Sequence, residues 1–323
     1  MTKRLCLFAG YSKHNVIEDY VVYYLKELSK HADIFYCADC NISAQELQKI
    51  KPYVKCSVAQ RHHKYDFGSW EISYKNVSNL AKYDELILAN DSVFGPLFPL
   101  DKVFSSMESK DVSAWGLCGN KFMMSFFIVL RKDVFLTPWF AEFITNIKDN
   151  IDKNDIVRIY EKGITQIVEE HGLKWDCVFS KKNLLAQFND NRDYLRKELK
   201  TIPFSIRFWH RYRPNKARVY DDDFFILFLL GMPFIKKKSF EMEHNHFDVL
   251  APIFITKYSD YDYGLIKSSL KLNNIFRIQT PLGRKILKSI QSFFFEKKYK
   301  GRGIVYKVFK IEVFVKKHEL TLK

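Results

Sequence analysis

Short apolar runs alternate with segments of helical periodicity along the first 180 residues. Apolar runs of about four to eight residues are typical of buried strands, whereas apolar residues spaced three and four apart indicate a helix with one buried face. The alternation predicts an α/β domain with a Rossmann-like, mixed sheet flanked by helices. Strands are expected at residues 5–10, 32–40, 54–61, 85–91, 113–119 and 125–133, and helices at 16–31, 69–82, 97–109, 138–149 and 155–170.

The pattern becomes irregular after Lys181. A polar segment precedes an aromatic and basic run, and an apolar helix then ends at Gly231 before a short strand at 233–240. No internal repeat or low-complexity linker separates these parts. We expect one catalytic domain over residues 1–250 and a C-terminal basic, aromatic and helical appendage over residues 251–323.

Composition limits the class of protein. With 47% apolar and 16% aromatic residues, the chain can bury a large core, which excludes a disordered protein. No run approaches the roughly 20 uncharged apolar residues that span a bilayer, and the N-terminal apolar run is too short for a signal peptide. We therefore expect a cytoplasmic protein. Cys37 and Cys40 are the one cysteine pair with metal-like spacing, and we expect them to be ordinary reduced thiols.

The positive charge is concentrated at the C-terminal end. Residues 281–323 carry twelve Lys and Arg against three Glu, a net charge of +9 out of a total of +15. Basic residues interleaved with aromatics suit an anionic membrane surface. Nucleic acid would attract the same charge, but no zinc finger, RNA-binding strand motif or basic helix-turn-helix accompanies it. A solvated segment that packs on the body remains open as an alternative.

Polar residues follow the apolar strand that ends near residue 89. Asn90, Asp91 and Ser92 come directly after it, and Gly95 and Pro96 close the turn. Open α/β sheets bind ligands at the carboxyl ends of their strands. The sequence therefore predicts a ligand site at this turn.

Five segments of the chain resemble the rhamnan synthesis F family of cell-surface polysaccharide glycosyltransferases in order and spacing. The resemblance implies a transferase that uses a nucleotide-sugar donor and, more distantly, the GT-A plan, in which the donor lies over the carboxyl edge of the sheet. The segments are YDFGSW at 65–70, YDELILANDSVFGPL at 83–97, WGL at 115–117, FFIVLRKDVF at 126–135 and YEKGITQIVEEHG at 160–172.

In the GT-A plan a short acidic motif holds a divalent cation against the donor diphosphate. The resemblance places Asp91 in that role, with Mn²⁺ or Mg²⁺ as the expected cofactor. Only one of the three residues is a carboxylate, which departs from the usual Asp-x-Asp form. Asn90 and Ser92 either complete the cation's shell or bind the sugar or ribose directly. An Asx-type turn, in which Asp91 satisfies local amides, is the structural alternative.

Asp66 and Gly68 match positions that contact the donor in GT-A enzymes. A carboxylate can accept hydrogen bonds from a sugar diol, and a glycine lets backbone approach a ligand closely. Asp66 or Ser69 could instead cap a helix that starts near Trp70. The basic residues at 61–64 would meet a diphosphate or, alternatively, face solvent.

An inverting transferase needs a base that takes the acceptor's proton. Glu161 matches the acidic residue of GT-A sequences at a helix opening, and Gln166 is near enough on the same helix to touch a bound sugar. The alternative for Glu161 is a favourable charge at a helix N-terminus. Arg211 lies in an aromatic and basic run suited to closing over the donor phosphates. The acidic residues at 221–223 are more typical of a helix N-cap than of a metal site.

These features together predict an inverting glycosyltransferase of polysaccharide or lipopolysaccharide biosynthesis. The expected reaction moves a sugar, rhamnose by the family's name, to a lipid-linked glycan acceptor at the inner face of the plasma membrane. The alternative is a non-catalytic, transferase-like scaffold that binds a glycan or a partner enzyme, which the single carboxylate at Asp91 motivates. A nucleic-acid binder rests on charge alone.

Overall fold

The computed structural model describes residues 2–199, 224–241 and 247–275, and the backbone of three short strands within 295–316. A seven-stranded mixed sheet forms its centre, in the order β3-β2-β1-β4-β7-β6-β8. β7 runs antiparallel to both of its neighbours, and the other pairings are parallel. The strands are β1 (Arg4–Gly10), β2 (Asp33–Ala38), β3 (Cys56–Ala59), β4 (Glu85–Asn90), β6 (Ala114–Gly119), β7 (Phe127–Arg131) and β8 (Trp175–Ser180).

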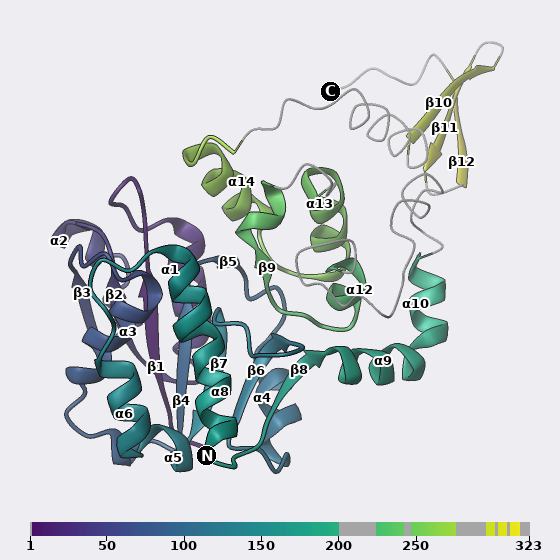
Figure 1. Cartoon of the computed structure of the whole chain (residues 1–323). Helices are drawn as coiled ribbons and strands as arrows, with labels where there is room; N and C mark the ends of the chain where they lie inside the picture. Colours follow the sequence, from purple (N-terminus) through teal and green to yellow (C-terminus); the bar gives the residue numbers. More distant parts are fainter. Residues whose placement is uncertain are drawn as a thin grey trace.

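Helices cover both faces of this sheet (Figure 1). Every residue of β1, β4 and β6 is buried, as expected for strands covered on both sides. The helices of this part are α1 (Asp19–Leu28), α2 (Ala44–Leu47), α3 (Tyr65–Lys75), η1 (Leu80–Lys82), α4 (Asp101–Glu108), α5 (Lys132–Phe135), α6 (Pro138–Thr145), α7 (Lys153–Asp155), η2 (Ile156–Glu161), α8 (Lys162–Glu170), α9 (Lys181–Asp190) and α10 (Arg192–Leu199).

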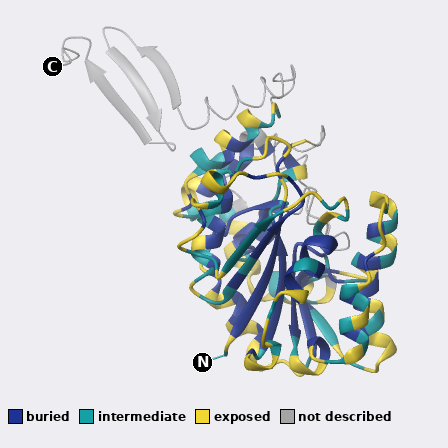
Figure 2. Cartoon of the chain, turned by 90° about the vertical axis from the view of Figure 1, so that its left-hand side faces the viewer, coloured by how far each residue is buried: buried dark blue, intermediate teal, exposed yellow. Residues whose placement is uncertain are grey.

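Two hydrophobic cores lie on opposite faces of the sheet. One packs α3, α6, η2 and α8 against the strands, and the other packs α1, α4 and the later helices against them. Figure 2 shows the strands as a dark blue, buried centre with exposed residues on the outer sides of the helices. The sheet edge at which the strands end is therefore held rigidly from both faces.

The predicted fold class, an α/β domain with a Rossmann-like mixed sheet flanked by helices, is confirmed. Several boundaries differ from the sequence expectation, and some elements, among them β8, α9 and α10, were not predicted. α3 begins at Tyr65, four residues before the predicted start at residue 69. β8 lies at the edge of the sheet and only two of its six residues are buried, so its apolar signal is weak.

The C-terminal part returns to the body. β9 (Ile235–Lys236) pairs with β5 (Val93–Phe94), directly after the turn that contains Asp91. The predicted domain boundary at residue 250 falls inside α13, whose Leu250 and Ala251 are buried in the same core as α1. Described elements of this part also include α12 (Phe224–Leu229), η4 (Lys237–Phe240), α13 (Phe247–Tyr258), α14 (Tyr263–Leu272), β10 (Phe295–Lys300), β11 (Gly303–Val308) and β12 (Ile311–Lys316).

The region expected to be a helical appendage is thus partly helical and partly strand. α13 and α14 are helices, whereas β10, β11 and β12 pair antiparallel with one another. In the part of the chain that the structure describes, none of the helices has the length and apolar character needed to cross a bilayer.

Candidate active site

Polar side chains from several strands converge at the carboxyl edge of the sheet. Asn90 ends β4, and Asp91 and Ser92 form the turn that follows. Because β7 runs antiparallel, its start lies at the same edge, and Ser125 precedes that start by two residues. Asp66 reaches the edge from the first turn of α3. The edge therefore gathers residues that lie far apart in the sequence.

The turn after β4 is organised by its own side chains. Asn90 is buried, and its Oδ1 accepts hydrogen bonds from the N–H of Ser92 at 3.1 Å and from the Ser92 hydroxyl at 2.6 Å. Oδ2 of Asp91 accepts the N–H of Tyr11 at 2.9 Å. Burial raises the pKa of Asp91 to about 6, while Lys237 and that N–H act in the opposite direction. The Asx-type turn considered above is therefore made by Asn90, which leaves Asp91 directed toward the loop after β1.

Asp66 joins this turn through Asn90. Nδ2 of Asn90 donates to Oδ2 of Asp66 at 2.8 Å. Burial and, to a smaller extent, repulsion from Asp91 raise the pKa of Asp66 to about 7. Lys236 partly opposes this shift. The expectation that Asp66 or Ser69 caps the helix is wrong, because α3 begins at Tyr65 and Lys64 occupies the capping position. Asp66 is thus held at the edge as a half-buried carboxylate with a hydrogen bond to the turn.

The segment before α3 has strained backbone. His63 has φ +59° and Tyr65 has φ +53°, in the left-handed region that residues with large side chains seldom adopt. Asp39, at the end of β2, holds the segment because its Oδ1 accepts the N–H groups of His62 and His63 at 2.8 and 2.9 Å. Strain of this kind concentrates at functional sites, where it persists because surrounding contacts fix it. Here those contacts set the position of Asp66.

Gly68 has a packing role in this segment. A Cβ atom at this position would lie 2.4 Å from Cβ of Lys64 and 2.5 Å from Nδ1 of His62. Gly68 was predicted to let the backbone approach a ligand closely. The space beside its Cα atom is filled by the segment before α3. Gly68 supports the site by allowing that segment to fold closely over the helix.

Gly68→Ala is expected to lower the free energy of unfolding by about 1–3 kcal/mol, as overpacking of a tight site does. The gain in helix propensity from alanine, about 1 kcal/mol, is too small to offset the clash. Urea unfolding followed by circular dichroism measures the change. Ser105→Ala, at an exposed position of α4, is the control and should leave the midpoint nearly unchanged. Equal stability of the wild-type protein and Gly68→Ala would contradict the packing role.

Glu161 points toward the same edge from a continuous helical segment. That segment starts at Lys153, with Asp152 as its N-cap, and passes through the π-helical η2 before α8. The alternative that Glu161 is a favourable charge at a helix N-terminus is therefore wrong, because the N-terminus lies eight residues earlier. Oε1 of Glu161 accepts the N–H and the hydroxyl of Ser125 at 3.2 and 3.1 Å. π-helical turns are frequent at functional sites, and this one directs a carboxylate to the sheet edge.

Lys236 is the cation of the site. Its Nζ donates to the Ser92 hydroxyl at 3.1 Å and lies 4.4 Å from the centre of the Phe126 ring. Burial lowers the pKa of Lys236 to about 8, against the opposing influence of Glu161 and Asp66. These shifts show that Lys236 and the two carboxylates lie within electrostatic reach of one another.

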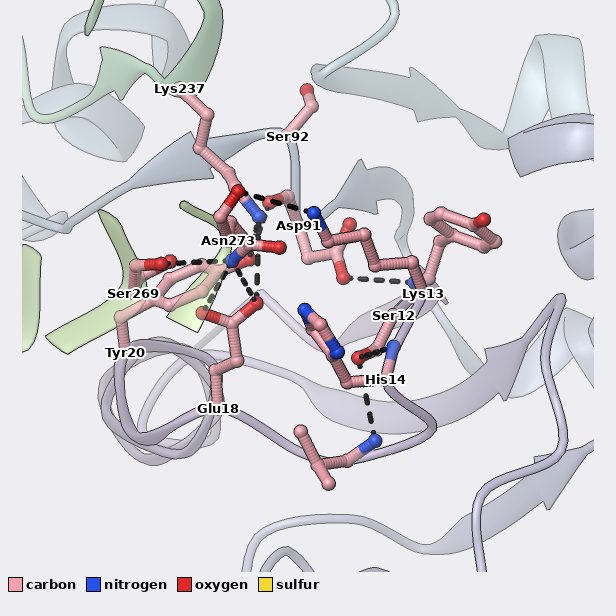
Figure 3. A network of polar contacts seen from close by, with 12 residues as sticks. Ser12, Lys13, His14, Glu18, Tyr20, Asp91, Ser92, Lys237, Ser269 and Asn273 are labelled. Atoms are coloured by element: carbon pink, nitrogen blue, oxygen red, sulfur yellow. Dashed lines mark hydrogen bonds and ion pairs between the residues drawn. The ribbon is translucent and has the colours of Figure 1, made fainter. Parts of the chain in front are cut away.

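A second network lies on the other side of the turn (Figure 3). Nζ of Lys237 donates to the Tyr20 hydroxyl at 2.8 Å and lies 3.8 Å from Glu18. The Tyr20 hydroxyl donates to the carbonyl of Asp91 at 2.9 Å. Asn273, just after α14, donates to Glu18 at 3.2 Å, so the C-terminal helices are fastened to the site. Figure 3 shows these side chains around Asp91 and the loop after β1.

The donor set at Asp91 does not fit a metal site built by the protein. The expected partners, Asn90 and Ser92, bond to each other, and Ser92 also accepts from Lys236. Within residues 2–199, 224–241 and 247–275, no three His, Cys, Asp or Glu side chains are grouped to hold a metal ion. The assignment of Mn²⁺ or Mg²⁺ to Asp91 stays a prediction.

One other predicted residue, Gln166, is described and is not part of this cluster. Gln166 is exposed on α8 and donates to Glu170 at 2.8 Å, so the structure does not bring it to Glu161. Arg211 and its aromatic neighbours lie outside the described residues, as do the three acidic residues at 221–223. Their roles stay predictions.

One group of side chains is arranged like a catalytic triad but cannot act as one. It consists of Asp39, His62 and Ser69. Nε2 of His62 lies 3.0 Å from Oγ of Ser69, and Nδ1 lies 3.6 Å from Asp39. However, Nδ1 accepts the N–H of Lys64 at 3.2 Å, and burial lowers the pKa of His62. The neutral ring therefore carries its proton on Nε2 and donates to Ser69. It cannot remove the serine proton.

The sequence reading missed two residues of the cluster, Ser125 and Lys236. Ser125 lies just before the segment at 126–135 that carries the family resemblance, and is not part of it. Lys236 lies in a run of three lysines, and it differs from the other two in that it ends β9, whereas Lys237 and Lys238 begin η4. Strand β9 is paired with β5, which lies 141 to 143 residues earlier in the sequence, and Val93 is opposite Lys236. Only the tertiary pairing identifies it.

Comparison with known proteins identifies the family of the chain. The family model described as rhamnan synthesis protein F matches residues 34–202, more than half of the chain. The chain belongs to this family. The match contains Asp66, Asn90, Asp91, Ser125 and Glu161, whereas Lys236 lies beyond it. The chain is thus a glycosyltransferase of the rhamnan synthesis F family.

Three of the solved structures that are similar to the chain are as follows. GlyE, a glycosyltransferase of Streptococcus pneumoniae TIGR4, has a TM-score of 0.41 at 12% identity, over 85% of this chain and 64% of its own. Staphylococcus aureus TarS 1-349 in complex with UDP has a TM-score of 0.35 at 9% identity, over 97% and 98%. The Mn/GDP-form of core-mannan synthase A from Aspergillus fumigatus has a TM-score of 0.29 at 10% identity, over 45% and 63%. No curated protein matches the chain.

Proposed function

We propose that the cluster at the carboxyl edge transfers a sugar from a nucleotide-sugar donor to a hydroxyl of a cell-surface glycan, with inversion at the anomeric carbon. The observation that carries the proposal is the meeting of Glu161, Asp66, Asn90, Asp91 and Lys236 at one sheet edge. These residues offer a base, hydroxyl-binding carboxylates and a cation, which are the groups that such a transfer needs.

The proposed reaction is a single displacement. The acceptor oxygen attacks the anomeric carbon while the bond from that carbon to the diphosphate oxygen breaks, and the nucleoside diphosphate leaves with the bonding electrons. Glu161 takes the proton of the acceptor hydroxyl, and Ser125 holds the carboxylate in place through two hydrogen bonds. Asp66 and Asn90 bind hydroxyls of the sugar. The scheme needs no covalent intermediate, because the acceptor oxygen attacks the anomeric carbon directly.

The nucleoside end of the donor fits the loop after β1. Tyr11 is 48% exposed at this edge, and the guanidinium of Arg61 lies 5.5 Å from the centre of its ring. An exposed aromatic ring beside a planar cation suits stacking of a base. Oδ2 of Asp91 accepts a hydrogen bond from the N–H of Tyr11, so Asp91 links this subsite to the sugar subsite.

Our proposal for the donor sugar and the acceptor is based on the family. Its description as rhamnan synthesis protein F supports a rhamnosyl donor such as dTDP-rhamnose and a lipid-linked polysaccharide or lipopolysaccharide acceptor. The net charge of +9 over residues 281–323 supports docking at an anionic membrane surface on the cytoplasmic side. The alternative of a non-catalytic scaffold rests on the single carboxylate of the turn after β4.

A panel of nucleotide-sugars tests the binding half of the proposal. Ligands that bind the native state raise the midpoint of thermal unfolding by mass action. We expect one nucleotide-sugar to raise the midpoint of the wild-type protein and to lose this effect in Asp91→Ala. Asp84→Ala is the matched control, because Asp84 lies beside the opposite end of the same strand and is paired with Lys132. No shift with any donor, with or without Mn²⁺ or Mg²⁺, would reject the site.

A further inference from the structure

We propose that Lys236 binds the donor's diphosphate and neutralises the charge that develops on it as the sugar leaves, so that transfer proceeds without a divalent cation. This inference rests on the proposed function and adds the group that stabilises the leaving diphosphate. It accounts for the difference between the metal-binding motif that was expected and the side chains that surround Asp91.

Backbone pairing fixes Lys236 beside the turn after β4. In the β5–β9 pair Val93 lies opposite Lys236. The N–H of Lys237 donates to the carbonyl of Ser92 at 3.0 Å, and the N–H of Leu97 donates to the carbonyl of Pro233 at 2.7 Å. Hydrogen bonds on both sides of Lys236 therefore hold its backbone in register. The ammonium group is delivered to the site by a strand and not by a mobile loop.

Neighbouring lysines point in different directions. Lys236 ends β9, whereas Lys237 and Lys238 begin η4. Lys236 reaches Ser92 and the ring of Phe126, while Lys237 reaches Tyr20 and Glu18. Lys238 is exposed. One residue of the run is thus directed to the edge where Asp66 and Glu161 lie.

A diphosphate can bind beside Lys236 only if a positive charge offsets the nearby carboxylates. Asp66, Asp91 and Glu161 place three carboxylates at an edge where a doubly charged diphosphate must bind. Repulsion among these groups would prevent binding unless a positive charge lies between them and the phosphates. An ammonium group binds phosphate as a compact point charge. Its effect is strong here because the half-buried position keeps water away. The hydrogen bond to Ser92 holds Nζ on the side of the turn that the diphosphate would approach.

The test compares Lys236→Met with Lys238→Met, which removes the same charge from an exposed position of the same run. Affinities for UDP, GDP and dTDP, and for the corresponding nucleosides, are measured by calorimetry in excess EDTA. We expect the wild-type protein to bind one of these diphosphates in EDTA. Lys236→Met should bind it at least about 10-fold more weakly, with unchanged affinity for the nucleoside, and Lys238→Met should bind it like the wild-type protein. Lys236→Arg should recover part of the loss, because it keeps the charge.

Turnover in excess EDTA is the second readout, and thermal unfolding of each variant shows that it is folded. Transfer that stops in EDTA and returns with Mn²⁺ or Mg²⁺ would overturn the inference and leave the proposed function standing. Equal diphosphate affinity of Lys236→Met and the wild-type protein would overturn it in the same way. No binding of any diphosphate to the wild-type protein, with or without metal, would overturn the proposed function and this inference together.

Discussion

Glu161→Gln is expected to lower kcat for sugar transfer by about 10²–10⁴-fold, the usual contribution of a positioned general base. Glutamine keeps the shape of the side chain, and its carbonyl oxygen can still accept the hydrogen bonds from Ser125. It cannot take the acceptor's proton. Donor affinity should change by less than about threefold, because the base acts on the acceptor and not on the donor. The loss therefore appears in kcat with little change in donor KM.

Glu142→Gln is the control for this experiment. Glu142 is exposed on α6. Its substitution by glutamine removes the same charge from a position that does not reach the sheet edge. Activity of that variant should equal that of the wild-type protein. A Glu161→Gln variant that retains more than about one tenth of the wild-type kcat would remove Glu161 from the base role, since transfer would then proceed without it.

Asp66→Asn is expected to stabilise the ligand-free protein at neutral pH while it weakens donor binding. The folded state raises the pKa of Asp66 to about 7, compared with about 3.9 in an unfolded chain. The folded protein therefore binds a proton more tightly than the unfolded chain. Between pH 4 and pH 7 its stability falls as the pH rises, because ionising Asp66 costs more in the folded state. Above pH 7 this cost is fully present, and below pH 4 it is absent.

Asparagine removes that cost and can still accept the hydrogen bond from Asn90. The stability of Asp66→Asn relative to the wild-type protein should therefore increase from pH 5 to pH 8, by about 1–3 kcal/mol for a half-buried group. Urea unfolding at both pH values measures it. Asp190→Asn, at an exposed position of α9, should show no such increase. A difference that shrinks toward pH 8 would contradict the assigned environment of Asp66.

The sequence predicted the sheet and its edge because both depend on local signals. The fully buried run of β4 and the polar residues after it are readable from the order of side chains. The same holds for the end of α8, where a glycine is a local signal for a helix C-cap: φ of Gly172 is +70°, and the N–H of Leu173 donates to the carbonyl of Val168 at 3.1 Å. Glu161 and Asp66 came from the family resemblance, and the structure brings both to the edge that Asn90 and Asp91 form.

What the sequence could not predict depends on distant pairing. Lys236 reaches the site through a strand pair with β5, and no local pattern fixes that register. The π-helical turn at η2 directs Glu161 inward, whereas an ideal helix beginning at that residue would have made it a terminal charge. Gln166 shows the opposite case, since its spacing from Glu161 puts it on the exposed side of α8.

The central claim is that this edge catalyses transfer and does not merely bind a donor. The most direct test is ³¹P NMR of the wild-type protein with its best nucleotide-sugar, with and without a lipid-linked glycan acceptor. We predict release of the nucleoside diphosphate that depends on the acceptor and is absent in Glu161→Gln. Tight binding of the donor with no release of diphosphate in the presence of a glycan that the protein binds would contradict the claim, and would identify the chain as a scaffold.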